Sequence, residues 1–230
     1  ATPTPVVSYN LVASGAGGGA VITASHNPAV WNGFKYKPDY GGSASPDVVT
    51  ELETKIAKTQ LSGDVRRMPI ELAEREGMVN RFDPRLPYAK HVGRLVDLDV
   101  IRRSGIRVVV DSMYGAGSGY IADLAKGTFC DVIEIRNEPN PSFPGMSQPE
   151  PLAHNLGGLQ KEVTQTNADL GVATDGDADR LGIVDEEGRY LSTLQTFALL
   201  CMHRLEVKGD RGPLVRSITM TSMIDKLGLI

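Results

Sequence analysis

The sequence predicts an α/β fold, and two features support this prediction. Short apolar runs rich in β-branched residues alternate along the chain with longer stretches whose apolar residues recur at helical spacing. Turns rich in glycine and proline separate these segments. Because strands that alternate with helices are typical of α/β proteins, the 230 residues are expected to form more than one unit of this class.

The first 86 residues are expected to contain one strand and two helices. The apolar run at residues 20–23 follows the glycine-rich residues 15–19 and suits a buried strand. After Ser45, apolar residues at helical spacing predict a capped amphipathic helix. Residues 69–77 predict a second helix.

Residues 84–87 contain two prolines and predict a linker, where we place a domain boundary. A helix at residues 88–98 and a strand at residues 107–111 follow. The strand leads into the glycine-rich residues 115–119, after which a helix begins near Tyr120. The glycine spacing is one position short of a dinucleotide-binding motif, so we interpret these residues as a tight turn between strand and helix.

The same order of elements repeats in the following residues. A proline-rich loop at residues 137–151 precedes a helix at residues 152–165. Further strands are predicted at residues 132–135, 168–174, 181–184 and 189–191. The last two strands flank a tight turn and predict a two-stranded ribbon. After Ser192 we expect a helix, a turn, a strand at residues 214–219 and a helix that starts at Thr221.

Composition and charge exclude several classes of protein. An apolar share of 41% and a charged share of 23% suit a soluble globular protein. A formal net charge of −4 offers no broad basic surface for a nucleic-acid backbone, so we expect no nucleic-acid partner. No apolar run approaches the roughly 18 residues that would span a bilayer, so we expect no membrane contact. Cys130 and Cys201 are far apart, which suits a reducing cytoplasm.

The loop expected between residues 174 and 181 is acidic. Asp175, Asp177 and Asp179 stand at alternate positions and place three hard oxygen donors close together, as Mg²⁺ or Mn²⁺ requires. A solvated acidic turn is the alternative that spacing alone leaves open. A calcium loop of the EF-hand type is disfavoured because Arg180 occupies the position where that loop needs glycine. Arg180 offers a guanidinium group suited to a phosphate oxygen or to a neighbouring carboxylate.

Ser25 follows the predicted strand at residues 20–23 and precedes Pro28, which restricts the backbone. At the end of a strand, Ser25 could act as a nucleophile that takes up a phosphoryl group, and His26 could donate a hydrogen bond near that group. An ordinary polar turn is the alternative interpretation. Lys35 follows an expected Asn-Gly turn that could fold it back over the serine, where it could exchange a proton with a sugar hydroxyl. A solvated lysine at the surface is the alternative interpretation.

The serine segment and the acidic loop, in this order on an α/β pattern, resemble the α-D-phosphohexomutase family of phosphoglucomutases and phosphomannomutases. Residues 32–35, residues 108–111 with 115–117, and residues 143–151 add to the resemblance, which covers nearly the whole chain. It implies that phosphorylated Ser25 exchanges a phosphoryl group with a hexose phosphate through a hexose 1,6-bisphosphate intermediate. It also implies a Mg²⁺ ion held by Asp175, Asp177, Asp179 and a phosphate oxygen on Ser25. By the same resemblance, Lys35 and His26 are candidates for proton transfer or phosphate contact, and Arg180 is expected to steady the transferring group.

The resemblance also implies a domain organisation. Members of the family have four domains, of which the first three are three-layer α/β/α domains with mixed sheets. We therefore expect residues 1–86 to be most of domain I, residues 87–190 to be domain II, and residues 191–230 to be the start of domain III. The chain is expected to be an N-terminal fragment that lacks the sugar-recognition loop of domain III. The sequence does not predict an oligomeric state.

Two other functions remain open from the sequence. The chain could be a non-catalytic, metal-dependent module that binds phosphosugars. It could also be a phosphatase, in which water takes the phosphoryl group from Ser25. We expect the mutase.

Overall fold

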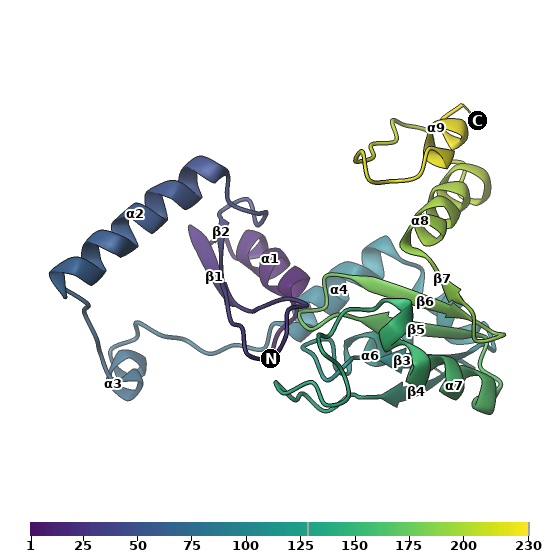
Figure 1. Cartoon of the computed structure of the whole chain (residues 1–230), viewed down its shortest axis with the longest axis horizontal. Coiled ribbons are helices and arrows are strands. Elements are labelled where there is room, and N and C mark those ends of the chain that lie inside the picture. Colours follow the sequence, from purple (N-terminus) through teal and green to yellow (C-terminus); the bar gives the residue numbers. More distant parts are fainter. Residues whose placement is uncertain (128, 230) are drawn as a thin grey trace. The chain divides into compact units, whose positions relative to one another are not determined.

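The computed structural model describes residues 1–127 and 129–229 (Figure 1). The chain divides into two compact units. We call residues 2–24 and 32–96 the N-terminal unit, and Ala1 with residues 25–31 and 97–230 the C-terminal unit. The start of a third domain was predicted at residues 191–230, and the last of these residues lies outside the described ranges. The predicted division after residues 86 and 190 stays a prediction.

The N-terminal unit is built on a two-stranded ribbon. Strand β1 (Gly18–Ile22) pairs antiparallel with β2 (Phe34–Pro38), and Val21 stands opposite Lys35. The ladder continues beyond β2 because the N–H of Thr23 donates to the carbonyl of Gly33 at 3.0 Å. The Asn-Gly turn expected just before Lys35 is therefore wrong, since Gly33 extends the ribbon.

Helix α1 (Thr4–Ala13), which the sequence analysis did not predict, packs on β1. Val6 and Leu11 of this helix are buried. A Cβ atom on Gly19 would lie 2.6 Å from Cδ1 of Leu11, so glycine permits the close approach of helix and strand.

Three more helices complete the N-terminal unit: α2 (Pro46–Ser62), α3 (Ile70–Arg75) and α4 (Arg85–Leu95). The linker expected at residues 84–87 is wrong, because α4 begins at Arg85. Pro87 lies in the first turn of α4, where a missing N–H leaves no helical hydrogen bond unmade. The ring of Tyr9 stacks on His91, with 4.4 Å between ring centroids. The predicted helix at residues 88–98 is thus the end of α4 followed by a break.

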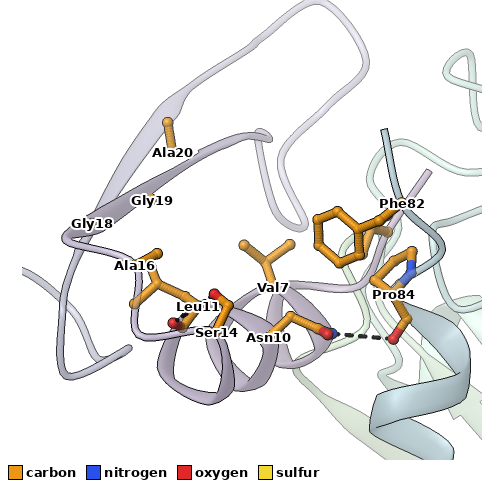
Figure 2. Close-up of a pocket in the computed structure, with 11 residues that line it drawn as sticks. Val7, Asn10, Leu11, Ser14, Ala16, Gly18, Gly19, Ala20, Phe82 and Pro84 are labelled. Atoms are coloured by element: carbon orange, nitrogen blue, oxygen red, sulfur yellow. Dashed lines mark hydrogen bonds between the residues drawn. The ribbon is translucent and has the colours of Figure 1, made fainter. Parts of the chain in front are cut away.

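A groove of about 360 Å³ lies between α1, β1 and residues 82–84 (Figure 2). Val7 and Leu11 of α1 line it together with Phe82. Asn10 donates a hydrogen bond from Nδ2 to the carbonyl of Pro84 at 3.1 Å, which joins α1 to the start of α4.

The C-terminal unit contains a five-stranded mixed sheet with the order β4-β3-β5-β6-β7. Strands β3 (Arg107–Asp111), β4 (Asp131–Ile135) and β5 (Leu170–Thr174) are parallel. Strands β6 (Leu181–Asp185) and β7 (Tyr190–Leu191) run antiparallel to their neighbours. All five lie at or within a few residues of the predicted strands.

Helices cover both faces of this sheet. On one face Val109 and Ala173 pack with Leu159 and Val163 of α7 (Gly157–Thr166), which follows a 3₁₀ turn at Ala153–Asn155. On the other face Val108, Val110 and Val172 pack with residues of α5 (Leu98–Arg103) and α6 (Tyr120–Ala125). The predicted three-layer α/β/α arrangement with a mixed sheet is confirmed in this unit.

The chain continues into α8 (Thr193–Met202), a π-helical turn at His203–Val207 and α9 (Met223–Leu227). Ser192 and Gln195 form a capping box at the start of α8. The strand predicted at residues 214–219 is wrong: these residues form a coil and a turn, and no strand of the described residues pairs with them. In the described part of the chain, every helix is too short or too polar to cross a membrane.

Candidate functional site

The acidic loop connects β5 to β6 at the carboxyl end of β5. The turn after β3 lies against it, because β3 and β5 are parallel neighbours whose carboxyl ends share one edge of the sheet. The N–H of Ala116 donates to the carbonyl of Gly176 at 2.9 Å. A Cβ atom on Gly115 would lie 2.7 Å from the same carbonyl oxygen, so only glycine fits there without displacing the acidic loop.

The structure brings the three predicted metal ligands together. Carboxylate oxygens of Asp175, Asp177 and Asp179 all lie within 4.8 Å of one another. The side chains of Asp175 and Asp177 are buried, whereas Asp179 is exposed. Three convergent carboxylates on one short loop fit a divalent ion with oxygen ligands, and Mg²⁺ completes such a set with water or phosphate oxygens.

Asp175 is held in place by the loop that it starts. Its Oδ1 accepts hydrogen bonds from the N–H groups of Asp179 at 2.9 Å and Arg180 at 3.0 Å. Burial, with the nearby charges of Asp177 and Asp179, raises the pKa of Asp175 to about 7 although these N–H groups lower it. A carboxyl group that ionises this reluctantly is stabilised in its charged form by a bound cation.

Ser25 lies beside two of these carboxylates. Its Oγ donates to Oδ1 of Asp177 at 3.3 Å and, more weakly, to Oδ2 of Asp175 at 3.5 Å. The residue has φ of 56°, a left-handed conformation that is uncommon outside glycine and is often found at functional sites. Gly176 lies so close to the carbonyl of Ser25 that a Cβ atom would collide with it.

Of the other predicted site residues, His26 and Arg180 belong to the same unit as the acidic loop and contact its site, whereas Lys35 belongs to the N-terminal unit. Nδ1 of His26 is 3.4 Å from Oγ of Ser25, and whether the ring donates or accepts there depends on its tautomer. Arg180 joins the site through its backbone N–H, while its guanidinium pairs with Glu150 at 2.8 Å. Lys35 lies in β2 of the N-terminal unit, so its role near the serine stays a prediction.

A set of polar residues that was not predicted from the sequence supports this edge of the sheet. Arg136 pairs with the buried Asp111 through two nitrogens and donates to the carbonyl of Asn155 at 3.1 Å. The amide of Asn155 in turn donates to the carbonyls of Gln148 and Glu150. A signal was available, because Asp111 ends a predicted strand and a carboxylate in that buried position requires a partner.

Comparison with known protein families gives two matches. Residues 1–62 match the model of phosphoglucomutase/phosphomannomutase alpha/beta/alpha domain I, and residues 86–188 match that of domain II. The chain belongs to the α-D-phosphohexomutase family. The predicted family membership is confirmed.

Individual relatives support this assignment. A phosphoglucomutase/phosphomannomutase from Thermococcus kodakarensis is 35% identical over 98% of the chain and 47% of its own length. A probable phosphoglucosamine mutase from Methanopyrus kandleri is 33% identical over 97% of the chain and 47% of its own length. The chain spans about half the length of these curated relatives.

Solved structures of the phosphohexomutase family share the fold. A putative phosphomannomutase from Thermus thermophilus superposes with a TM-score of 0.83 at 30% identity, over 99% of the chain and 50% of that structure. A phosphoglucomutase/phosphomannomutase family protein from Burkholderia thailandensis has a TM-score of 0.74 at 20% identity, which supports the fold alone. It covers 99% of the chain and 48% of that structure.

Proposed function

We propose that the chain carries the phosphoryl-transfer centre of a phosphosugar mutase. The observation that supports this best is the position of Oγ of Ser25, 3.3 Å from Asp177 and 3.5 Å from Asp175. A hydroxyl beside a cluster of metal-binding carboxylates is suited to carry a phosphoryl group whose charge the metal offsets.

In the proposed reaction, phosphorylated Ser25 gives its phosphoryl group to a free hydroxyl of a hexose phosphate. The O–P bond at Ser25 breaks and a new O–P bond forms at the sugar, while the sugar hydroxyl gives up a proton to a base of the site and Oγ of Ser25 takes up a proton. The resulting hexose 1,6-bisphosphate then reverses its orientation in the site and returns its other phosphoryl group to Ser25. The net result moves a phosphoryl group between the 1- and 6-positions.

The site residues take separate roles in this scheme. Asp175, Asp177, Asp179 and a phosphate oxygen on Ser25 would hold Mg²⁺, which supplies positive charge to the transferring group. His26 contacts Oγ of Ser25 and is a candidate to hold or move a proton there. Lys35 is the second candidate for proton exchange, with the sugar hydroxyl. Arg180 would steady the transferring phosphoryl group.

The names of the relatives support a substrate class, since one is a phosphoglucomutase/phosphomannomutase and another a probable phosphoglucosamine mutase. We therefore propose a hexose phosphate, with hexose 1,6-bisphosphate as intermediate and activator. The 230 residues alone are expected to turn over weakly or not at all, because the family resemblance assigns sugar recognition to a later domain.

A coupled assay that converts glucose 1-phosphate to glucose 6-phosphate tests this proposal. We expect activity from a protein extended to the length of the relatives, and loss of that activity in its Ser25→Ala variant. Comparable activity of the 230-residue chain would contradict the expected weak turnover. Steady release of inorganic phosphate in place of glucose 6-phosphate would indicate a phosphatase, and an extended protein without either activity would favour a binding module.

A further inference from the structure

The guanidinium of Arg180 is held by a carboxylate that the proposed reaction does not use. Its NH1 donates to Oε1 of Glu150 at 2.8 Å. The side chain of Glu150 is 19% exposed and that of Arg180 is 43% exposed, so the pair lies at the surface of the site with its acidic member largely covered.

Glu150 is fixed by its own neighbours. Its Oε2 accepts a hydrogen bond from Nε2 of Gln148 at 2.9 Å. Nδ2 of Asn155 donates to the backbone carbonyl of Gln148 at 2.9 Å and to that of Glu150 at 2.8 Å. Because Asn155 is buried, these bonds hold the backbone of residues 148–150 in one conformation.

The same segment rests on the acidic loop. Pro149 is fully buried, and its Cγ would be 3.0 Å from a Cβ atom on Gly176. The carbonyl oxygen of Pro151 would be 2.5 Å from a Cβ atom on Gly182, at the start of β6. Residues 148–151 therefore pack against Gly176 and Gly182, which stand on either side of Arg180 in the sequence, and this packing places Glu150 next to Arg180.

Arg180 is consequently held at two points. Its backbone N–H donates to Asp175, a proposed metal ligand, and its guanidinium meets Glu150 through one nitrogen. Because Glu150 contacts only NH1 of Arg180, the second terminal nitrogen of the guanidinium can donate to an anion. A bidentate pair with Glu150 would occupy two of the guanidinium nitrogens.

We propose that Glu150 is a positioning residue for Arg180. It orients the guanidinium next to the acidic loop and offsets part of its charge, so that a phosphoryl group is aligned for transfer but bound only moderately. This inference rests on the proposed function, since it assumes that Arg180 contacts a phosphoryl group.

The inference predicts opposite effects on binding and on transfer. In Glu150→Gln a similar side-chain shape remains, but a negative charge near the anion is lost and Arg180 is less restrained. We expect the affinity for inorganic phosphate to rise by about threefold to tenfold. We expect the rate of phosphoryl transfer to Ser25 to fall by about tenfold or more. Without the carboxylate of Glu150, the guanidinium of Arg180 must be ordered during the reaction itself, and this loss of entropy raises the barrier. A purely structural role for Glu150 would weaken both.

The test uses inorganic phosphate with Mn²⁺ as the binding probe, measured by isothermal titration calorimetry on the 230-residue chain. Glu187→Gln is the matched control, because Glu187 also pairs with an arginine, Arg189, at 2.8 Å but lies in the exposed turn between β6 and β7. Thermal unfolding of each variant confirms that it is folded. Tighter phosphate binding in Glu150→Gln and unchanged binding in Glu187→Gln is the expected result.

A double-mutant cycle on the transfer rate tests whether Glu150 acts through Arg180. In an extended protein, Glu150→Gln should slow phosphorylation of Ser25 by glucose 1,6-bisphosphate, and should have no further effect when Arg180 is already replaced by Ala. Equal or weaker phosphate binding by a folded Glu150→Gln variant, or no measurable binding in any variant, would overturn the inference. A transfer effect that persists without Arg180 would overturn it as well.

The two proposals fail in different ways. If Glu150→Gln binds phosphate more tightly but Ser25 is never phosphorylated in any protein, the effect on anion binding stands and the mutase is wrong. If Ser25 is phosphorylated equally fast with and without the carboxylate of Glu150, the mutase stands and the positioning role is wrong.

Discussion

Oγ of Ser25 lies 3.3 Å from Oδ1 of Asp177, although 152 positions separate the two residues in the sequence. The serine loop and the acidic loop are therefore parts of one site in the C-terminal unit. This contact joins two separate sequence motifs in a single arrangement of a serine hydroxyl and acidic side chains, which are the proposed nucleophile and the proposed metal ligands.

Replacing Asp177 with Asn should weaken metal binding. The change removes one negative charge from three carboxylates that lie within 4.8 Å of one another, and it replaces a carboxylate oxygen, a proposed metal ligand, with the weaker oxygen of an amide. We expect the dissociation constant for Mn²⁺ to rise by about tenfold or more. Electron paramagnetic resonance of free Mn²⁺ measures this directly, with Glu187→Gln as a control for the loss of one acidic charge. Equal affinity in the two variants would show that Asp177 is not a ligand.

Metal affinity should fall as the pH falls below about 7. The pKa of Asp175 in the metal-free chain is raised to about 7, mainly by burial, so below that pH a metal ion must displace a proton. In the metal-free chain, the stability of the fold changes with pH in the opposite direction to metal affinity, because ionising this buried carboxyl costs free energy. The contribution of Asp175 to the free energy of unfolding is present below the normal pKa of an aspartate and is lost as the pH rises through 7. Mn²⁺ titrations at pH 6 and pH 8 should differ by up to about tenfold. Identical affinities would contradict the prediction.

Gly115→Ala should disturb the acidic loop from outside it. The added Cβ would lie 2.7 Å from the carbonyl oxygen of Gly176 and 3.0 Å from that of Asp175, and both belong to backbone that cannot rotate away. We expect a loss of about 1–3 kcal/mol in the free energy of unfolding, together with weaker Mn²⁺ binding. Urea denaturation of this variant is compared with that of Gly158→Ala, where nothing lies within 4 Å and alanine suits the helix. A loss of stability in Gly158→Ala as large as that in Gly115→Ala would remove the steric explanation.

Arg136→Met should destabilise the C-terminal unit strongly. It leaves Asp111, which is fully buried, without its positive partner. Breaking one side of a buried ion pair typically costs about 3–5 kcal/mol. Glu187→Gln breaks an exposed pair and should cost less than about 1 kcal/mol. Equal denaturation midpoints for the two variants would contradict the role given to the buried pair.

The sequence was most informative where strands and helices alternate. The strand at residues 107–111 and the ribbon around residues 186–188 were predicted because apolar runs and turn residues mark them locally. The strand predicted at residues 214–219 has the same local signal. It failed because a strand also needs a neighbour, and pairing is a property of the whole fold that no local pattern contains.

The candidate site shows the same division. Asp175, Asp177 and Asp179 could be grouped from their spacing. Ser25 was a possible nucleophile from its place after a strand, and the family resemblance favoured this role over an ordinary polar turn. The need of the buried Asp111 for a partner could be predicted from its place at the end of a strand. Its link through Arg136 and Asn155 to Glu150 could not, because the fold alone brings these residues together at the edge of the sheet.

Mass spectrometry of Ser25 tests the central claim most directly. The chain, and a protein extended to the length of the relatives, would each be incubated with glucose 1,6-bisphosphate and Mg²⁺ and then analysed by intact mass and peptide mapping. The proposal predicts an adduct of about 80 Da on Ser25, at least in the extended protein, that is absent from Ser25→Ala. No adduct in either protein, with metal bound and both proteins folded, would contradict the role of Ser25 as the phosphoryl carrier.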